Sequence, residues 1–310
     1  MILPPCLDGL ALEDIFEPPH PGPEPGPPPF GHGSPVRLGD VPAGLVGQPA
    51  WVLAQSLLPS LGEREALDLV AFGTLWLDNH VLDDPKAALP GGTFRLNLPW
   101  YGPHVFYEVD PARLVFRDGD ILVYDKESGP ATVPVPHDSR NNLHAALERH
   151  TRLTLRAPHR LDAPTSGLVI MAANRLAASR IGVAFKKGQV RKRYLALSSG
   201  PLPGFSVTTV DAPISKQNGR LMAIQDGPGR PSRTRVSFLR AFGDRLLFLA
   251  EPETGRTHQI RLHLALLGYP IAGDRLYGGE SADRLMLKAS GLCFRHPGTG
   301  QTLTLGGPWP

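Results

Sequence analysis

The chain has little cysteine, no long hydrophobic run and no basic residue near its amino terminus. Its 310 residues include two cysteines, Cys6 and Cys293, which are too few and too far apart for a disulfide framework or a zinc-finger spacing. No apolar run approaches the roughly 18 residues that a transmembrane helix needs. No lysine or arginine precedes Arg37, so the basic start of a signal peptide is missing. These absences predict a cytoplasmic protein without a membrane segment.

Charge is distributed unevenly along the chain. Residues 1–40 carry one basic and six acidic side chains, and residues 41–110 carry three and eight, so each segment has a net charge of −5. Residues 111–310 carry 28 basic and 15 acidic side chains, a net charge of +13. Such a surplus is typical of a domain that binds a polyanion, although a solvated basic surface without a ligand has the same composition. The charge therefore favours nucleic acid as the partner.

Composition and periodicity predict three segments. Residues 1–40 have eight prolines within positions 18–29 and are expected to form a disordered tail. Residues 41–104 show two helical patterns followed by a strand, a turn and another strand. This small appendage resembles the RNA-binding domain of the ribosomal-protein-four type, although its helices offer only Arg64 as a cation. Residues 105–310 form the expected main domain.

Short strands alternate with helices in the main domain without a regular β-α-β order, which predicts an α+β fold with a mixed sheet. One helix is expected to begin after Thr257 as its N-cap and to end at Gly268. Strands are expected at 120–124, 167–172, 194–197 and 246–249, and helices at 175–185 and 257–267.

Asp162 is the strongest catalytic candidate. It lies in the run His-Arg-Leu-Asp-Ala-Pro-Thr-Ser-Gly (159–167), just before the apolar residues Leu168-Val169-Ile170-Met171. A loop that leads into a buried strand can hold a carboxylate rigidly in a site. The alternative is that Asp162 pairs with Arg160 or caps the Pro-Thr-Ser turn.

A basic run precedes Tyr194. Five of the eight residues at 186–193 are Lys or Arg, and the tyrosine ring follows at the head of a strand. Cations bind phosphates, and an aromatic ring offers a face on which a base can stack. The alternative is a solvated charge run beside a tyrosine at a sheet edge.

A third segment contains Arg256 immediately before the expected helix. At this position its guanidinium can pair with a buried carboxylate. His258 and His263 are five residues apart, which spoils the shared helix face that a metal site would need, and no cluster of cysteines or acids completes such a site. We therefore expect no metal, and we expect His263 to pack within the fold.

Together the three segments resemble the RluA family of pseudouridine synthases. The similar stretches are 159–168, 193–197 and 255–264, and the further stretch 268–278 follows them in the family's order and spacing. The resemblance implies a catalytic domain over residues 105–310, with a central mixed, mostly antiparallel sheet and an RNA cleft. It also implies isomerisation of uridine to pseudouridine in structured RNA, either ribosomal or transfer RNA, without a cofactor.

The resemblance also implies roles for individual residues. Asp162 would be catalytic with Tyr194 and Arg256, where Tyr194 would stack on the extruded base. Ile260 would supply an apolar wall beside that base. The remaining contacts with RNA would come from Arg160, Thr165, Lys186, Lys187, Arg191 and Lys192. The chain lacks a phosphate-binding glycine loop or a dinucleotide fingerprint, in agreement with a cofactor-free isomerase.

Three points stay open at this stage. The segment Asp125–Gly129 departs from the family's usual Asn-Lys-Pro-x-Gly, and we expect this change to lie on the flank of the sheet and to leave the catalytic set intact. An RNA-binding protein that has lost catalysis is one alternative, and a hydrolase that uses Asp162 with His159 is another. The acidic appendage is expected to have lost general RNA affinity, and to pack on the main domain or meet a protein partner through Trp51 and Trp76.

Overall fold

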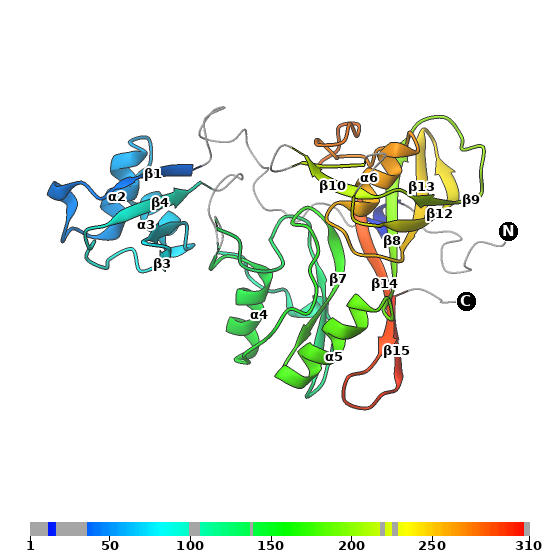
Figure 1. Cartoon of the computed structure of the whole chain (residues 1–310), viewed down its shortest axis with the longest axis horizontal. Helices are drawn as coiled ribbons and strands as arrows, with labels where there is room; N and C mark the ends of the chain where they lie inside the picture. Colours follow the sequence, from blue (N-terminus) through cyan, green and yellow to red (C-terminus); the bar gives the residue numbers. More distant parts are fainter. Residues whose placement is uncertain are drawn as a thin grey trace. The chain divides into compact units, whose positions relative to one another are not determined.

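The computed structural model divides the chain into two compact units, which are described separately (Figure 1). The larger unit comprises Met1–His20, Pro111–Gly129 and Thr154–Pro310, and the smaller unit comprises Pro21–Asp110 and Pro130–Leu153. None of the helices in the described part of the chain is both long enough and apolar enough to cross a membrane. The structure describes residues 12–16, 36–98, 106–136, 139–217, 221–224 and 229–306.

A nine-stranded sheet forms the centre of the larger unit, in the order β5-β6-β7-β14-β8-β13-β12-β9, with β15 paired to β14. Strands β7 and β14 are parallel, and the other neighbouring pairs are antiparallel. This arrangement confirms the predicted α+β fold with a mixed, mostly antiparallel sheet. The strands are β5 (Leu114–Arg117), β6 (Ile121–Lys126), β7 (Ser166–Ala172), β8 (Arg191–Ser199), β9 (Val207–Asp211), β12 (Arg233–Phe242), β13 (Arg245–Pro252), β14 (Leu287–Arg295) and β15 (Thr302–Leu305), and a separate pair is formed by β10 (Ile214–Gln217) and β11 (Leu221–Ile224).

Helices α5 (Arg175–Lys186) and α6 (Gln259–Leu266) each bury one apolar face in a core cluster of this sheet. Helix α5 begins where the Asn174 side chain accepts a hydrogen bond from the Ala177 amide at 2.8 Å. The prediction of Thr257 as the N-cap of α6 is wrong, because His258 occupies that position with left-handed backbone angles. Gly268 follows the helix with φ +84°, as expected for a terminal glycine.

A short segment near the amino terminus covers apolar residues of the sheet in the larger unit. Helix α1 (Leu12–Ile15) is followed by Phe16, and the Ile15 and Phe16 side chains are each 4% exposed. They lie in one cluster with Leu197 of β8 and Leu247 of β13. Alternate residues of a strand face opposite sides of a sheet. Leu197 and Leu247 therefore face away from α6, and the amino-terminal segment covers the side that α6 leaves open.

Part of the predicted disordered tail is therefore ordered. The expectation for residues 1–40 is wrong for Leu12–Phe16, because the apolar side chains of this segment are buried, and for Val36–Asp40, because it pairs as strand β1. The proline-rich run at 18–29 lies outside the described residues.

The buried amino-terminal segment leads to a prediction about stability. Replacing Ile15 by alanine should lower the free energy of unfolding by about 2 kcal/mol, because it removes buried apolar contacts. Urea unfolding followed by fluorescence measures the change. Leu202→Ala is the matched control, since the Leu202 side chain is 70% exposed and should contribute little. Equal effects of the two substitutions would contradict the burial of this segment.

The smaller unit has a four-stranded antiparallel sheet in the order β1-β4-β2-β3. Its core includes Leu53, Leu69 and Leu96, all fully buried. Two helices followed by a hairpin are present, at the positions where the sequence pattern predicts them. The elements are α2 (Ala50–Leu57), α3 (Glu63–Ala71), α4 (Leu143–Thr151), β1 (Val36–Asp40), β2 (Leu75–Leu77), β3 (His80–Leu82) and β4 (Thr93–Asn97).

The smaller unit also contains the segment Pro130–Leu153, which sequence analysis assigned to the main domain. Hydrogen bonds attach it: the Trp76 indole donates to the Pro136 carbonyl at 3.1 Å, and the Ser139 hydroxyl donates to the Gly73 carbonyl at 2.9 Å. Trp76 also lies under the Arg95 guanidinium at 4.9 Å. The smaller unit has a net charge of −5 and the larger one of +8.

The expectation that Trp51 and Trp76 are exposed contact residues is wrong, because both side chains are partly buried. Trp51 packs against the core of the smaller unit. Trp76 is held by Arg95 and by the Pro136 carbonyl.

Candidate active site

Asp162 lies in a tight turn that leads into β7. The turn is closed by the Thr165 amide, which donates to the Asp162 carbonyl at 3.0 Å. The Asp162 side chain is 22% exposed, and its Oδ2 lies 3.8 Å from Nε2 of His258. The carboxylate is therefore partly shielded from water while still reachable from outside.

The segment that departs from the family pattern holds this turn from behind. Lys126 is fully buried, and its Nζ donates to the carbonyls of Glu127 at 2.7 Å and Ala163 at 2.8 Å. The Ser128 hydroxyl donates to the Pro164 carbonyl at 2.8 Å, and the Gly129 amide donates to the Ala163 carbonyl at 2.9 Å. The segment that differs from the family pattern therefore supports the turn that carries Asp162.

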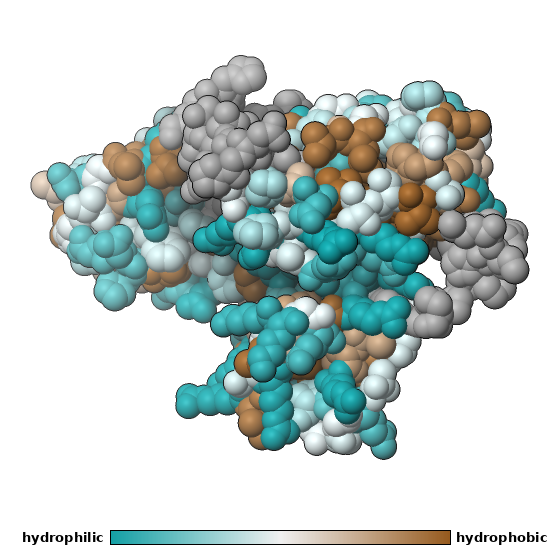
Figure 2. Space-filling view, turned by 45° about the vertical axis from the view of Figure 1, so that its right-hand side comes forward, coloured by the Kyte–Doolittle hydropathy of each residue, from teal (hydrophilic) through white to brown (hydrophobic). Residues whose placement is uncertain are grey.

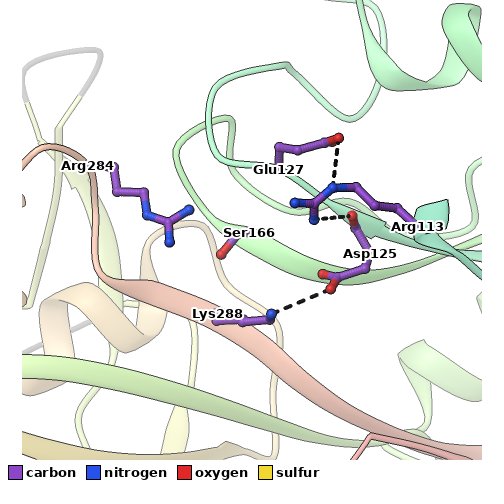
Figure 3. A pocket seen from close by; sticks show the side chains of 6 residues that line it. All are labelled: Arg113, Asp125, Glu127, Ser166, Arg284 and Lys288. Carbon is purple, nitrogen blue, oxygen red and sulfur yellow. Dashed lines mark hydrogen bonds and ion pairs between the residues drawn. The ribbon is translucent and has the colours of Figure 1, made fainter. Parts of the chain in front are cut away.

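Ion pairs fix the same segment in place (Figure 3). The Arg113 Nε lies 3.1 Å from the Glu127 carboxylate, and the Lys288 Nζ lies 3.4 Å from the Asp125 carboxylate. Burial lowers the pKa of Lys126 to about 7, while the charges of Glu127 and Asp162 oppose this shift. The negative charge of Asp162 thus favours the protonated form of Lys126.

The order of the strands brings Asp162 to Tyr194. Gly167 of β7 is paired with Ala289 of β14, and Ala289 is paired with Tyr194 of β8. Gly167 has φ +109°, and a Cβ atom there would collide with the backbone of Ala289, so only glycine fits. The close approach of β7 to β14 places the turn that carries Asp162 beside the start of β8.

Tyr194 presents a protonated phenol near Asp162. Burial raises the pKa of Tyr194, and the negative charge of Asp162 raises it further. Ile260 of α6 is 6% exposed and belongs to the cluster against which Tyr194 packs. Ile260, the expected apolar wall for the base, and the expected aromatic ring of Tyr194 therefore lie in the same cluster.

Arg261, rather than Arg256, is the arginine that faces Asp162. The Arg256 Nε donates to the Pro231 carbonyl at 3.1 Å, and among the described residues it forms no ion pair with Asp162. Arg261 is 4% exposed, and its Nε and Nη2 each lie 2.7 Å from an oxygen of Asp274. The pKa of Arg261 is raised, against the effect of burial, by Asp274 first and then by the charge of Asp162.

The prediction that Arg256 pairs with Asp162 is therefore wrong. Arg256 precedes the helix and lies in a loop closed by its own amide, which donates to Gln259 Oε1 at 3.0 Å. Arg261 is the third residue of α6, three positions after His258, which precedes the helix with left-handed backbone angles. This spacing from His258 is the signal that could have identified it from the sequence. Lys126 offered no comparable signal, because only the fold turns it inward.

The basic run divides into exposed and buried cations. Lys186, Lys187 and Arg191 are exposed, in agreement with a role in phosphate binding. Lys192 points inward: its Nζ donates to the Thr254 carbonyl at 2.7 Å, and burial lowers its pKa to about 8. Lys192 is thus partly buried and bonded within the protein, and its contact with RNA stays a prediction. In Figure 2, hydrophilic side chains cover most of the lower part of the view, the level at which α5 and β15 lie in Figure 1.

Two other predicted RNA contacts differ in exposure. Arg160 is exposed, and its charge reaches His258. Thr165 is 3% exposed and its amide closes the turn at Asp162, so its contact with RNA stays a prediction.

Two histidines have roles within the fold. His159 Nε2 accepts a hydrogen bond from the Ile170 amide at 2.9 Å, and its ring stacks on Phe185. Burial lowers the pKa of His159 to about 3, so the imidazole is neutral, and its Nε2 is already occupied by the Ile170 amide. His159 is therefore a poor general base, which argues against the hydrolase alternative. His263 is fully buried, with Nδ1 2.8 Å from the Thr234 hydroxyl, as expected for a packed histidine.

The chain is similar to proteins that act on uridine in RNA. A family model described as RNA pseudouridylate synthase matches residues 120–266. An uncharacterized RNA pseudouridine synthase of Chloroflexus aurantiacus is 34% identical over 266 residues, which cover 82% of this chain and 84% of that protein. Ribosomal large subunit pseudouridine synthase D of Nitrosomonas europaea is 34% identical over 222 residues, 66% of this chain and 63% of that protein.

A solved structure agrees with this similarity. Human RNA Pseudouridylate Synthase Domain Containing 1 superposes with a TM-score of 0.53 at 30% sequence identity. The match covers 66% of this chain and 87% of that chain.

Proposed function

Because the chain belongs to the RluA family of RNA pseudouridine synthases, which isomerise uridine to pseudouridine in RNA, we propose that Asp162 is its catalytic residue. One observation carries this proposal. Four ionisable side chains from three separate segments have pKa values on which the charge of Asp162 acts: Lys126 of β6, Tyr194 of β8, and His258 and Arg261 at the start of α6. A carboxylate at the meeting point of several segments is typical of a catalytic group.

Isomerisation of uridine needs a nucleophile or base beside the ribose and the uracil ring. The bond between N1 of uracil and C1′ of the ribose breaks, the base turns, and a bond forms between C5 and C1′. One proton leaves C5 and one is gained at N1, so no electron acceptor is required. An ionised carboxylate can act as the nucleophile, or as a stabiliser and base, in such a step. The uridine must first leave its stack, which costs a few kcal/mol.

The surrounding side chains suit an extruded base. We propose that Tyr194 stacks on the uracil and that Ile260 forms the apolar wall beside it. Arg160, which is exposed, would hold the space that the base vacates. Arg261, held by Asp274, would supply a positive charge that interacts with the Asp162 carboxylate. This set also weighs against the alternative of an RNA-binding protein that has lost catalysis.

We propose ribosomal RNA as the favoured target, acted on in the cytoplasm, with transfer RNA as the alternative. The support is the similarity to relatives named as ribosomal large subunit pseudouridine synthases, such as synthase D of Nitrosomonas europaea, of which the match spans 63%. Mapping of pseudouridines in total RNA from cells with and without the gene tests the target. Loss of a site in ribosomal RNA supports the proposal, and loss of a site only in transfer RNA contradicts it.

The exposed part of the basic run should bind phosphates. Replacing Lys186 and Lys187 by glutamine should weaken RNA binding and reduce the slope of log Kd against log salt by about 1–2, because fewer counterions are released. Arg64→Gln with Lys86→Gln is the matched control. It removes two exposed cations from the smaller unit and should leave the slope unchanged. Fluorescence anisotropy with one structured RNA at several salt concentrations measures both variants.

The same comparison tests the role of the smaller unit. We propose that it has no general affinity for RNA, because its net charge of −5 repels phosphates. An equal loss of slope in the two double variants would contradict this. Its likeness to the ribosomal-protein-four type stays a proposal, as does the domain boundary near residue 104. A protein partner for this unit is a further proposal, supported by Leu38, which is 70% exposed on β1.

A further inference from the structure

His258 has an unusual backbone for its residue type. Its φ of 56° and ψ of 18° lie in the left-handed region, which residues that have a Cβ adopt only at an energetic cost. It occupies the N-cap of α6, yet its side chain caps no amide. The surrounding loop holds this conformation, because Gln259 Oε1 accepts from the Thr254 hydroxyl at 2.7 Å and from the Arg256 amide at 3.0 Å. The strain therefore has a cause other than capping.

The conformation aims the imidazole at two groups. Nδ1 lies 2.7 Å from the Tyr277 hydroxyl, and Nε2 lies 3.8 Å from Oδ2 of Asp162. The His258 side chain is 18% exposed. The imidazole thus lies between a phenol and the carboxylate that we propose as catalytic.

Tyr277 is itself held rigidly. Its amide donates to Oδ1 of Asp274 at 3.3 Å, and its ring lies 5.1 Å from the Arg261 guanidinium. The loop begins at Gly273, with φ +79°, where a Cβ would collide with the carbonyl of Arg284. The buried pair of Arg261 and Asp274 therefore fixes the Tyr277 hydroxyl as well as the cation that faces Asp162.

The two contacts favour one tautomer of His258. Burial lowers the pKa of His258, and the charges of Arg261 and Arg160 lower it further. The charges of Asp162 and Asp274 oppose this shift but do not cancel it. The ring is therefore neutral at pH 7. A neutral ring carries one N–H. With the proton on Nδ1, the lone pair of Nε2 would face the carboxylate and repel it. The arrangement without repulsion has the Tyr277 hydroxyl donating to Nδ1 and the Nε2–H directed at Asp162.

We propose that His258 is a positioning residue whose Nε2–H orients the Asp162 carboxylate, and that the Tyr277 hydroxyl fixes the tautomer which makes this possible. The inference rests on the proposed catalytic role of Asp162. The separation of 3.8 Å is longer than a hydrogen bond, and catalytic hydrogen bonds often shorten only when the substrate is bound. Entry of the uridine then closes the contact and leaves the second oxygen of Asp162 facing the sugar and base.

The test compares three single variants and one double variant in single-turnover assays with a uridine-containing RNA. His258→Asn keeps a residue type that tolerates left-handed angles but is too short to reach Asp162. It should lower kcat by about ten- to a hundredfold, the range expected when a hydrogen bond to a charged group is lost, with KM changed less than threefold. His258→Gln places an amide N–H near the position of Nε2 and should recover most of this loss.

Tyr277 should act only through His258. Tyr277→Phe leaves the histidine without its tautomer-fixing donor and should lower kcat by about three- to tenfold, because part of the population adopts the repulsive tautomer. Combined with His258→Asn it should cause no further loss, which is the signature of two residues that act as one unit.

Wild-type kcat in His258→Asn would overturn the proposal. Additive losses in the double variant would overturn the role of Tyr277. The Asp162→Asn variant separates this inference from the proposed function. If Asp162→Asn is inactive while His258→Asn is fully active, only the role of His258 fails. If Asp162→Asn keeps its activity, the assignment of the catalytic residue fails.

Discussion

Replacing Asp162 by asparagine is expected to abolish pseudouridine formation, with a fall in rate of at least about a thousandfold. The amide has the shape of the carboxylate but no negative charge, so it cannot act as nucleophile or base. Affinity for RNA should stay within a few-fold, because the phosphate contacts are made elsewhere. A single-turnover assay of pseudouridine formation measures the rate, and anisotropy with the same RNA measures the affinity.

The control is Asp244→Asn, which makes the same change at an exposed carboxylate in the turn between β12 and β13 of the larger unit. It should keep the wild-type rate. Thermal unfolding of both variants shows that the fold is retained. Pseudouridine formation by Asp162→Asn at a rate near wild type would show that another group carries the reaction.

The two arginines of the α6 region should differ strongly. Arg261→Gln removes one partner of a buried ion pair, so it should lower the free energy of unfolding by about 3–5 kcal/mol and abolish activity. Arg256→Gln removes only a hydrogen bond to a carbonyl, and it should keep the fold and an activity within a few-fold of wild type. Urea unfolding and the single-turnover assay measure the two effects.

A third variant keeps this comparison informative if Arg261→Gln fails to fold. Arg261→Lys keeps a positive charge near Asp274 but loses the two-point geometry, since lysine has no planar fork of donors. It should fold, with a loss of activity between those of the other two variants. A larger loss of activity in Arg256→Gln than in Arg261→Lys would restore Arg256 as the partner of Asp162.

Much of the site could be predicted from local sequence. Asp162 was identifiable because it directly precedes an apolar run, and Tyr194 because it follows a cluster of cations. In the structure Asp162 lies in the turn before β7, and Tyr194 of β8 packs against the cluster that contains Ile260. Helices α5 and α6 and the four expected strands also follow from periodicity, because each element buries one face and local spacing records that face.

The local sequence pattern could not predict the direction in which side chains of the site point. Lys192 lies in a run of cations that reads as exposed, yet it donates to the Thr254 carbonyl because a loop from a distant segment lies against it. Arg256 and Arg261 belong to one motif, but Arg256 lies in the loop before α6 and Arg261 lies in the first turn of the helix. Their side chains therefore have different partners. The carboxylate that holds Arg261, Asp274, is distant enough in sequence that only folding brings it there.

The sequence by itself determined the family, the α+β class and the carboxylate at the head of β7, because motifs and periodicities are local properties of a chain. The tertiary structure decided which groups meet that carboxylate. Strand β14, from the carboxyl-terminal part of the chain, pairs between β7 and β8 and brings Gly167, Ala289 and Tyr194 into one row. Such pairing depends on long-range hydrogen bonds and on a glycine that allows two backbones to approach closely, and neither leaves a periodic signal in the sequence.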